Sequence, residues 1–317
     1  MIDSQRPGST DYLADLTWRL AMGASRIDDQ RRERHLAFFL RNQREDGGFP
    51  GRDDGDSDLY YTGFGARSLA VLGGMTPECV EKIADFLRSR LSGRESIVDL
   101  FSLIYAASIV QTMAEIDVFG DSRADWRTAL EAHFASLRRD DGGFAKAPAG
   151  HVSSTYHTFL VILCLQLIGS DLPEPTRIVD FIRDREAEDG GFHEIRVSKR
   201  AGTNPTAAAV AALRMLDGLD DGIRHRTTDF LIDMQTDEGG LRANTRIPIA
   251  DVLSTFTGMV TLADLDALDE LDLARVARYV DSLEHEQGGF HGAVWDEHRD
   301  VEYSFYGIGC LAILNGG

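Results

Sequence analysis

A glycine pair recurs along this sequence at a fixed interval, and that interval limits the possible folds more than any other feature. The first glycine of each pair is Gly47, Gly142, Gly190, Gly239 or Gly288, so the successive intervals are 95, 48, 49 and 49 residues. Phe follows each pair, except once where Leu does. Because 95 is close to twice 48, we expect one copy without its glycines near residues 92–94. The repeats therefore form six units of about 48 residues.

Each unit is predicted to consist of a helix, a turn and a second helix. The first helix carries charge on one face, as in residues 34–41, and belongs on the outside. The glycine pair fits the left-handed backbone that ends a helix, and the following Phe or Leu can pack against the core. The second helix is apolar all round, as in residues 159–168, and belongs inside. Such repeats form either a closed double ring or an open solenoid, and periodicity alone leaves both possible.

The predicted inner helices begin at residues that favour the cap position of a helix. These are Asp58, Ser154, Asn204, Asp251 and Asp300, with Pro205 at the first helical position and Asp99 starting the degenerate unit. Residues 1–30 predict an extra helix that covers one end of the structure. No linker interrupts the sequence, so we expect a single domain over residues 1–317, with the repeats starting near residue 31.

The composition excludes several classes of partner. A net charge of −19 repels nucleic acid and anionic membrane surfaces. The three cysteines, Cys79, Cys164 and Cys310, lie in apolar segments without paired spacing, which favours a reducing compartment and a cytoplasmic location. The first residues lack the apolar stretch of a signal peptide, and no apolar run approaches the roughly 18 residues that a membrane span needs.

The Asp-Gly-Gly-Phe loops at this period, each followed by an apolar helix, resemble the prenyltransferase and squalene-cyclase repeat superfamily over nearly the whole chain. Residues 300–311 resemble the last motif of the β subunits of protein prenyltransferases, particularly of geranylgeranyltransferase type II, and residues 58–62 and 150–156 resemble earlier repeats. The resemblance implies an all-α fold, an (α/α)6 barrel whose central apolar funnel holds an isoprenoid diphosphate. It also implies a partner protein built of α-type helical repeats.

The resemblance also implies a zinc ion that activates a thiolate, and this sequence departs from that pattern. Such a centre needs three protein ligands and an open fourth position. The family's Asp position is Asp251, but Leu253 stands at its Cys position and Tyr303 at its His position. Leucine cannot bind zinc and a neutral tyrosine is a poor ligand. We therefore expect no zinc and a helix-capping role for Asp251, and we keep Asp251 and Tyr303 as candidate catalytic residues of unknown role.

Basic residues precede two of the inner helices and are candidates for holding a diphosphate. They are Lys199, Arg200, Arg242 and Arg246, with Arg196 nearby, and Arg200 stands where the family has a histidine. Cations beside helix N-termini form an anion site because the free N–H groups add to the side-chain charge. The alternative interpretation is that they keep exposed loops soluble.

Aromatic residues near the predicted starts of the inner helices are candidates for contacting an isoprenoid chain. They include Tyr61, Tyr156 and Phe256, and Trp295 lies in the last loop. Aromatic walls suit an isoprenoid and stabilise a carbocation, but aromatic residues in apolar helices also commonly belong to the core.

Three functions remain open from the sequence. The first is a prenyltransferase β-like protein that binds an isoprenoid diphosphate and transfers it without the usual zinc. The second is a terpene cyclase of the squalene type, which needs a desolvated carboxylic acid. Residues 203–207 have no carboxylate where such cyclases carry one, and Asp56 and Asp58 are an imperfect substitute. The third is a barrel without catalytic activity that binds an isoprenoid or another protein.

Overall fold

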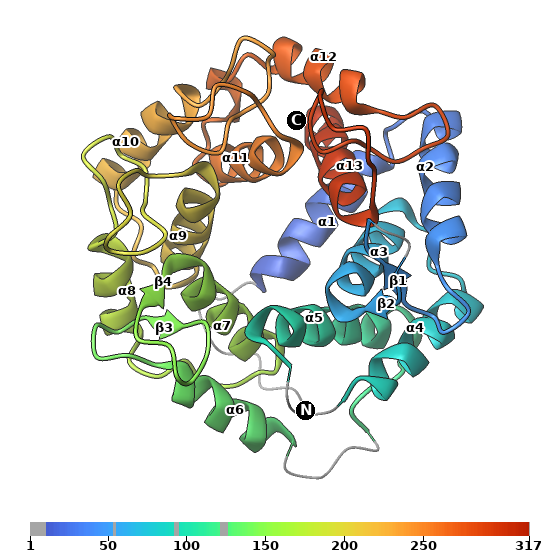
Figure 1. The fold of residues 1–317 in the computed structure, drawn as a ribbon, viewed down its shortest axis with the longest axis horizontal. Coiled ribbons are helices and arrows are strands. Elements are labelled where there is room, and N and C mark those ends of the chain that lie inside the picture. The colour runs from blue at the N-terminus through green and yellow to red at the C-terminus, as the bar shows by residue number, and fades with distance from the viewer. Residues whose placement is uncertain (1–10, 53–54, 92–94, 121–125, 317) are drawn as a thin grey trace.

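The computed structural model describes residues 11–52, 55–91, 95–120 and 126–316, which form a closed ring of helices in two layers (Figure 1). The outer layer contains α2 (Asp29–Asn42), α4 (Pro77–Ser89), α6 (Trp126–Leu137), α8 (Pro175–Arg183), α10 (Asp221–Ile232) and α12 (Leu273–Leu283). The inner layer contains α3 (Leu59–Leu72), α5 (Ile97–Ala114), α7 (Thr155–Leu167), α9 (Thr203–Met215), α11 (Val252–Asp264) and α13 (Val301–Gly316). A short 3-10 helix, η1 (Leu268–Glu270), precedes α12. The predicted all-α (α/α)6 barrel is confirmed.

Contacts between consecutive inner helices run from α3 through α5, α7, α9 and α11 to α13, and α13 packs back on α3. This last contact decides between the ring and the open solenoid in favour of the ring. One inner helix, α5, is long and apolar enough to cross a membrane, contrary to the expectation that no segment comes close. It packs between α3 and α7, and more than half of it is buried within the protein.

The predicted starts of four inner helices are confirmed, and two are wrong. Asp58, Ser154 and Asp251 each accept a hydrogen bond from a main-chain N–H in the first turn, and Asp300 accepts one from Tyr303. In the degenerate unit the cap is Ser96 rather than Asp99. Its missing glycine pair, expected at residues 92–94, lies outside the described residues.

The fourth inner helix, α9, begins two residues before the predicted start. Gly202 occupies the cap position, so Asn204 and Pro205 lie within the first turn. A side-chain cap is unnecessary there because the chain finds main-chain acceptors. The Gly202 N–H donates to Phe192 O at 3.2 Å, and the Thr203 N–H donates to Ala243 O at 2.9 Å.

The first glycine of every pair has a positive φ between 86° and 104°, as the turn prediction requires. A Cβ atom on it would lie 2.0 to 2.5 Å from a main-chain oxygen of the next outer helix. Gly47 meets α4 in this way, Gly142 meets α8, and the series continues around the ring. The last member, Gly288, packs on Arg34 of the first outer helix, α2. The contact that joins neighbouring units therefore also closes the ring.

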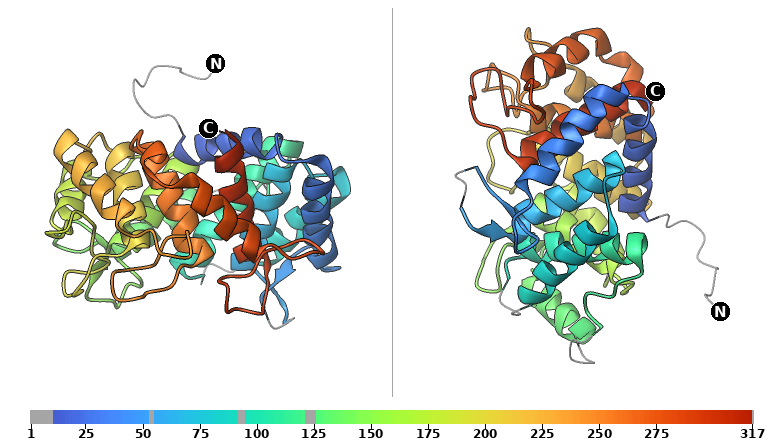
Figure 2. Two further views of the ribbon diagram at one scale, coloured as in Figure 1. Left: turned by 90° about the horizontal axis from the view of Figure 1, so that it is seen from above. Right: turned by 90° about the vertical axis from the view of Figure 1, so that its right-hand side faces the viewer.

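Two short strand pairs follow the glycine loops, where the sequence predicts only a turn. β1 (Phe49–Pro50) pairs with β2 (Ser57–Asp58), and β3 (Phe144–Ala145) pairs with β4 (Ser153–Ser154), both antiparallel. They bring the polar stretches after the first two glycine pairs back to the starts of α3 and α7. All these loops project from one end of the ring (Figure 2).

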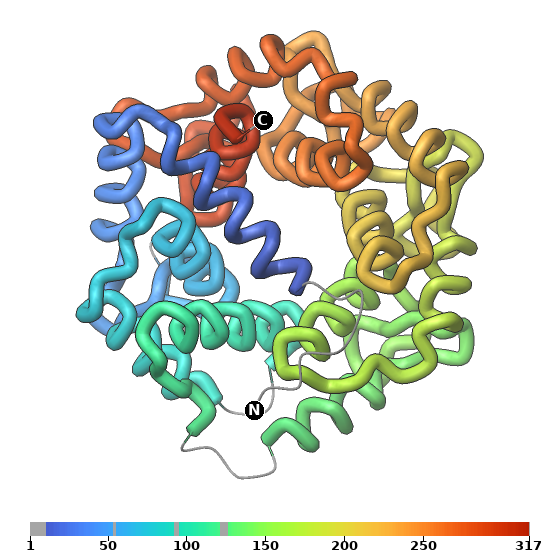
Figure 3. The backbone as a smooth tube through the Cα atoms, turned by 180° about the vertical axis from the view of Figure 1, so that it is seen from behind, coloured from blue at the N-terminus to red at the C-terminus, as the bar shows by residue number. Residues whose placement is uncertain are grey.

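A helix that precedes the repeats, α1 (Tyr12–Ala24), lies across the opposite end of the ring (Figure 3). It packs against α13 and α3. A buried carboxylate on α11 holds it, because Asp264 accepts hydrogen bonds from Tyr12 and Arg19, each at 2.8 Å. Arg214 of α9 also donates to Asp264. The ring thus has an end covered by α1, the α1 end, and an end formed by the loops, the loop end.

Polar contacts reinforce the closure between the last and first units. Glu284, at the end of α12, accepts hydrogen bonds from Arg34 and from His35 Nε2, the latter at 3.0 Å, and forms an ion pair with Arg31 at 2.6 Å. The His35 ring stacks on Phe290 with centroids 4.8 Å apart. We call this group of Arg31, Arg34, His35, Glu284 and Phe290 the closure cluster.

Candidate functional site

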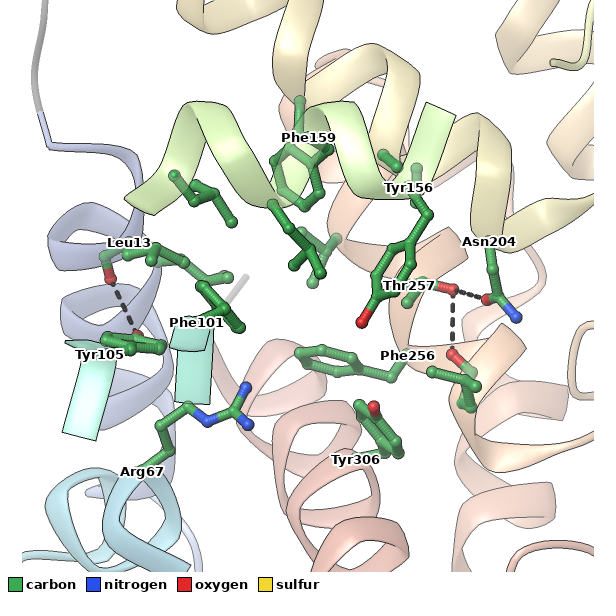
Figure 4. Close-up of a pocket in the computed structure, with 18 of the residues that line it drawn as sticks. Leu13, Arg67, Phe101, Tyr105, Tyr156, Phe159, Asn204, Phe256, Thr257 and Tyr306 are labelled. Atoms are coloured by element: carbon green, nitrogen blue, oxygen red, sulfur yellow. Dashed lines mark hydrogen bonds between the residues drawn. The ribbon is translucent and has the colours of Figure 1, made fainter. Parts of the chain in front are cut away.

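A cavity of about 370 Å³ lies inside the ring and is lined by all six inner helices and α1 (Figure 4). Its wall is mainly aromatic and aliphatic. The aromatic members include Phe64, Phe101, Phe159, Phe256, Phe305 and Tyr306. A cavity of this size and character suits an apolar ligand.

The loop end of the cavity is built from one position of the repeat. Its lining includes the second residue of five inner helices, namely Tyr60, Val98, Tyr156, Asn204 and Leu253. The corresponding residue of α13, Glu302, accepts a hydrogen bond from the Tyr60 hydroxyl at 2.7 Å. The helix caps described above fix the starts of these helices, so alignment of the four correctly predicted caps would have indicated Tyr60, Tyr156, Leu253 and Glu302 from the sequence. At the other end, α1 contributes Leu13, Leu16, Thr17 and Leu20.

Among the described residues that line the cavity, one is a cation, Arg67, which projects into it from α3 (Figure 4). Its guanidinium carbon lies 4.0 Å from the ring centroid of Phe64 and 5.0 Å from that of Phe305. The sequence analysis missed this residue. The signal was present, because Arg67 is the one charged residue in the otherwise apolar segment that forms α3.

Two carboxylates near the loop end of the cavity also escaped the sequence analysis. Glu194 lines the cavity and accepts a hydrogen bond from Ser154. Burial raises the pKa of Glu194 above its ordinary value, and it raises the pKa of Glu302 in the same way. Desolvation disfavours the charged form, so both groups hold a proton more readily than an exposed glutamate does.

Three of the predicted basic residues meet in one surface pocket, which we call the cation cluster. Lys199, Arg200 and Arg246 line it together with Asn244. The Arg200 guanidinium donates to Thr245 Oγ1 at 3.1 Å, which links the loop before α9 to the loop before α11.

The other predicted basic residues lie apart from the cation cluster. The Arg242 side chain turns away and donates to the Asp233 carbonyl at 2.9 Å. Arg196 is exposed on the same loop as Lys199 and is not part of the pocket lining.

Comparison with protein families matches the prenyltransferase alpha-alpha toroid domain at residues 12–103 and 97–316, which together span the two-layered ring. The chain belongs to the prenyltransferase alpha-alpha toroid family. No curated protein matches this toroid in sequence.

Solved structures share the toroid fold at low sequence identity. Protein geranylgeranyltransferase-I of Candida albicans, complexed with GGPP, is 15% identical with a TM-score of 0.74, covering 90% of this chain and 91% of that one. A type II terpene cyclase from Scytonema, in complex with geranylgeranyl dihydroxybenzoate, is 13% identical with a TM-score of 0.60, covering 96% and 99%. A glycosidase is 14% identical with a TM-score of 0.58, covering 94% and 96%. At these identities the likeness shows the fold alone.

The three positions at which the resemblance to prenyltransferase β subunits implies zinc ligands have other contacts in this structure. Both oxygens of Asp251 are engaged by Ser254, whose N–H donates to Oδ1 at 2.7 Å and whose hydroxyl donates to Oδ2 at 2.8 Å. Leu253 lines the cavity, and the Tyr303 ring lies 4.2 Å from the Arg52 guanidinium. Within the described parts of the chain, no three His, Cys, Asp or Glu side chains lie close enough together to hold a metal ion.

The predicted aromatic residues occupy different places. Tyr156 and Phe256 line the cavity. Tyr61 packs edge-on against Tyr60, with ring centroids 5.3 Å apart, outside the cavity lining. Trp295 is 69% exposed in the loop before α13. The toroid therefore brings two of the four to the cavity.

Proposed function

We propose that this protein binds an isoprenoid diphosphate, with its chain in the central cavity and its diphosphate at the cation cluster. The observation that supports the proposal is the combination of an apolar cavity inside the ring with three cations grouped on loops at the loop end of the same ring. The loops that bear Arg200 and Arg246 lead directly into α9 and α11, whose second residues, Asn204 and Leu253, line the cavity.

The charge distribution favours an anion at this place. The protein carries a net charge of −19, yet Lys199, Arg200 and Arg246 meet without a carboxylate in the lining of their pocket. Guanidinium groups bind phosphate oxygens through paired hydrogen bonds. Burial of the chain contributes about 0.8 kcal/mol per CH₂ group, so the wall supplies affinity while the cluster fixes the orientation.

We propose in addition that binding requires no zinc, because the residues at the family's ligand positions are engaged elsewhere. Asp251 caps α11, and Tyr303 stacks with Arg52. Burial raises the pKa of Cys164 and of Cys310, so neither supplies a thiolate from within the chain. A prenyl acceptor would have to come from another molecule and approach from the loop end.

The test is calorimetric binding of geranylgeranyl diphosphate to the purified protein and to single variants. Arg246→Met and Lys199→Met are each expected to weaken binding about tenfold, since a hydrogen bond to a charged group is worth about 1.5–3 kcal/mol. Arg242→Met is the matched control, because the Arg242 side chain donates to the Asp233 carbonyl instead of joining the cation cluster. This variant should bind the diphosphate as tightly as the wild type does. Addition of a metal chelator should leave the affinity for geranylgeranyl diphosphate unchanged.

Equal losses in Arg242→Met and Arg246→Met, or binding that disappears with the chelator, would overturn the proposal. Incubation with a thiol acceptor then separates two versions of it. A prenylated thiol identifies a transferase, whereas binding without turnover identifies an isoprenoid-binding protein.

One observation favours a terpene cyclase as a second candidate. Glu194 is a carboxylic acid in the cavity wall with a raised pKa, which suits protonation of a double bond. A second observation argues against a cyclase. The Arg67 guanidinium lies over the rings of Phe64 and Phe305, so these rings already contact a cation and are less able to stabilise a carbocation. A cyclic product from a polyisoprenoid, lost in Glu194→Gln, would establish the cyclase in place of the transferase.

A further inference from the structure

We infer that Arg67 binds a carboxylate of the ligand inside the cavity. The ligand would then be a terpenoid acid rather than a plain hydrocarbon chain. The inference rests on the proposed function only in placing a terpenoid chain inside the ring. It concerns a different group from the cation cluster, and it makes its own prediction about which ligands bind.

Arg67 is placed well inside the cavity. Its Cα lies eight residues after Leu59, the first residue of α3, or about 12 Å along the helix, and its side chain turns back by one turn to reach the Gly63 carbonyl. Its guanidinium carbon is also 5.5 Å from the ring centroid of Tyr105, whose hydroxyl lies 2.5 Å from Thr17 Oγ1 of α1. The guanidinium therefore lies inside the cavity at the level of Phe64 and Tyr105, apart from the surface pocket of the cation cluster.

The protein leaves most of this guanidinium unsatisfied. Nε donates to the Gly63 carbonyl at 2.9 Å. In the parts of the chain that the structure describes, no carboxylate forms an ion pair with Arg67, and neither Nη atom has a hydrogen-bond acceptor. Glu302 is near enough for Arg67 to lower its pKa, but its carboxylate accepts from Tyr60. The Nη groups face the open cavity among the rings (Figure 4).

A ligand that fills the cavity removes water from these N–H groups. A hydrocarbon offers no acceptor in return, so the buried charge would lose its hydrogen bonds without compensation. A carboxylate restores them, because its two oxygens match the two Nη groups of a guanidinium. The faces of Phe64, Phe305 and Tyr105 hold the guanidinium plane in place before the ligand arrives, which reduces the entropy lost on binding.

The test compares farnesoic acid with its methyl ester, which has the same chain without the charge. The wild type is expected to bind the acid at least tenfold more tightly than the ester. Arg67→Met should erase that preference while still binding the ester, and Arg67→Lys should keep only part of it, because lysine lacks the paired donors. Arg90→Met is the matched control, since Arg90 stacks on Phe86, which is outside the cavity lining, at 4.8 Å.

Equal binding of acid and ester by the wild type, or a preference that survives in Arg67→Met, overturns the inference. If Arg67→Met does not fold, the inference is tested by the ratio of acid to ester affinity in the wild type and in Arg67→Lys. Arg246→Met should keep the acid preference while losing affinity for geranylgeranyl diphosphate. Loss of the acid preference in Arg246→Met would assign the carboxylate to the cation cluster instead. If the wild type ignores the diphosphate but prefers the acid through Arg67, the proposed function fails and this inference stands.

Discussion

A hydroxyl at the fourth residue of an inner helix anchors each glycine loop. The main-chain N–H of the residue after each pair donates to it over 2.8 to 3.0 Å. The five hydroxyls belong to Thr62, Thr158, Thr206, Thr255 and Ser304. In the degenerate unit the fourth residue of α5 is Leu100, which has no hydroxyl. The glycine pair and the hydroxyl therefore occur together in one structural unit, which we call the loop joint.

Replacing one of these hydroxyls should destabilise the fold. Thr158→Val leaves the buried Phe144 N–H without its acceptor, and we expect a loss of about 1–3 kcal/mol in the free energy of unfolding. Thr158→Ser should recover most of that loss. Thr112→Val is the control, because the Thr112 hydroxyl forms an exposed bond to the Ser108 carbonyl. Urea unfolding measures all three, and equal midpoints for Thr158→Val and Thr112→Val would contradict the role of the loop joint.

The roles of some individual residues could be predicted from the sequence, and the roles of others could not. Asp58 and Asp251 could be assigned as helix caps, because cap preference depends on local main-chain geometry. Tyr156 and Phe256 could be chosen because they stand near helix starts. Arg67 could be noticed as the one charged residue of α3, but its direction into the cavity could not be predicted, since that depends on how six helices pack around the centre.

Among the elements, α1 is distinctive because polar contacts attach it to the ring. Asp264, with 1% of its side chain exposed, holds Tyr12 and Arg19 of α1 together with Arg214. Asp264→Asn should weaken this attachment by roughly 1–3 kcal/mol, discounted because both arginines are partly exposed. We expect faster hydrogen exchange in α1 with little change in α7. Asp266→Asn, at an exposed neighbour, is the control. Unchanged exchange in α1 would show that apolar packing alone holds the helix.

Helices could be predicted at this scale more completely than the connections between them. Charge on one face distinguished the outer helices, and continuous apolar character distinguished the inner ones. The strand pairs β1–β2 and β3–β4 were missed because each strand has two residues, too few for an alternating pattern. The predicted start of α9 was two residues too late, because Asn204 is a residue type that favours the cap position. In the structure, main-chain contacts allow Gly202 to occupy that position.

For the whole molecule, the closure cluster makes stability depend on pH. The Gly289 N–H donates to His35 Nδ1 at 3.1 Å, so Nε2 carries the hydrogen that Glu284 accepts, and the ring is neutral. Burial lowers the pKa of His35. Burial acts to raise the pKa of Glu284, but hydrogen bonds from His35, Arg31 and Arg34 outweigh it and lower this pKa to about 2.

Both shifts act in the same direction. The unfolded chain binds a proton at these groups more readily than the folded protein does, so acid favours unfolding. The contribution of His35 is complete above its unfolded pKa of about 6.5 and declines as the pH falls below that value. The contribution of Glu284 declines below about pH 4 and continues to fall toward pH 2.

We therefore expect the melting temperature to fall between pH 7.5 and pH 5. His35→Gln should flatten this part of the profile, because an amide does not titrate, and it should melt lower than the wild type at pH 7.5. His225→Gln is the control, since His225 has 82% of its side chain exposed. Differential scanning calorimetry across the range measures each profile. Parallel profiles for the wild type and His35→Gln would show that the closure cluster is not the acid-sensitive element.

Closure was also the property that could not be predicted from the residues of the repeat. A period of about 48 residues specifies the unit, and the curvature that brings the last unit to the first is the sum of small rotations between neighbours. The closed barrel was predicted from the family resemblance. The structure shows the contact that closes it, in which Gly288 packs against the Arg34 main chain.

The closure contact also sets the order in which the protein can be completed as it is synthesised. The bond between Gly289 and His35 joins residues 254 positions apart, and Phe290 packs on a histidine made near the start. Contacts of such long range form late, because the loop-closure entropy must be lost before they contribute. Until residue 290 leaves the ribosome, α2 lacks its final neighbour, and until α13 follows, the cavity lacks its last wall. The ligand site therefore exists only once α13 has been made.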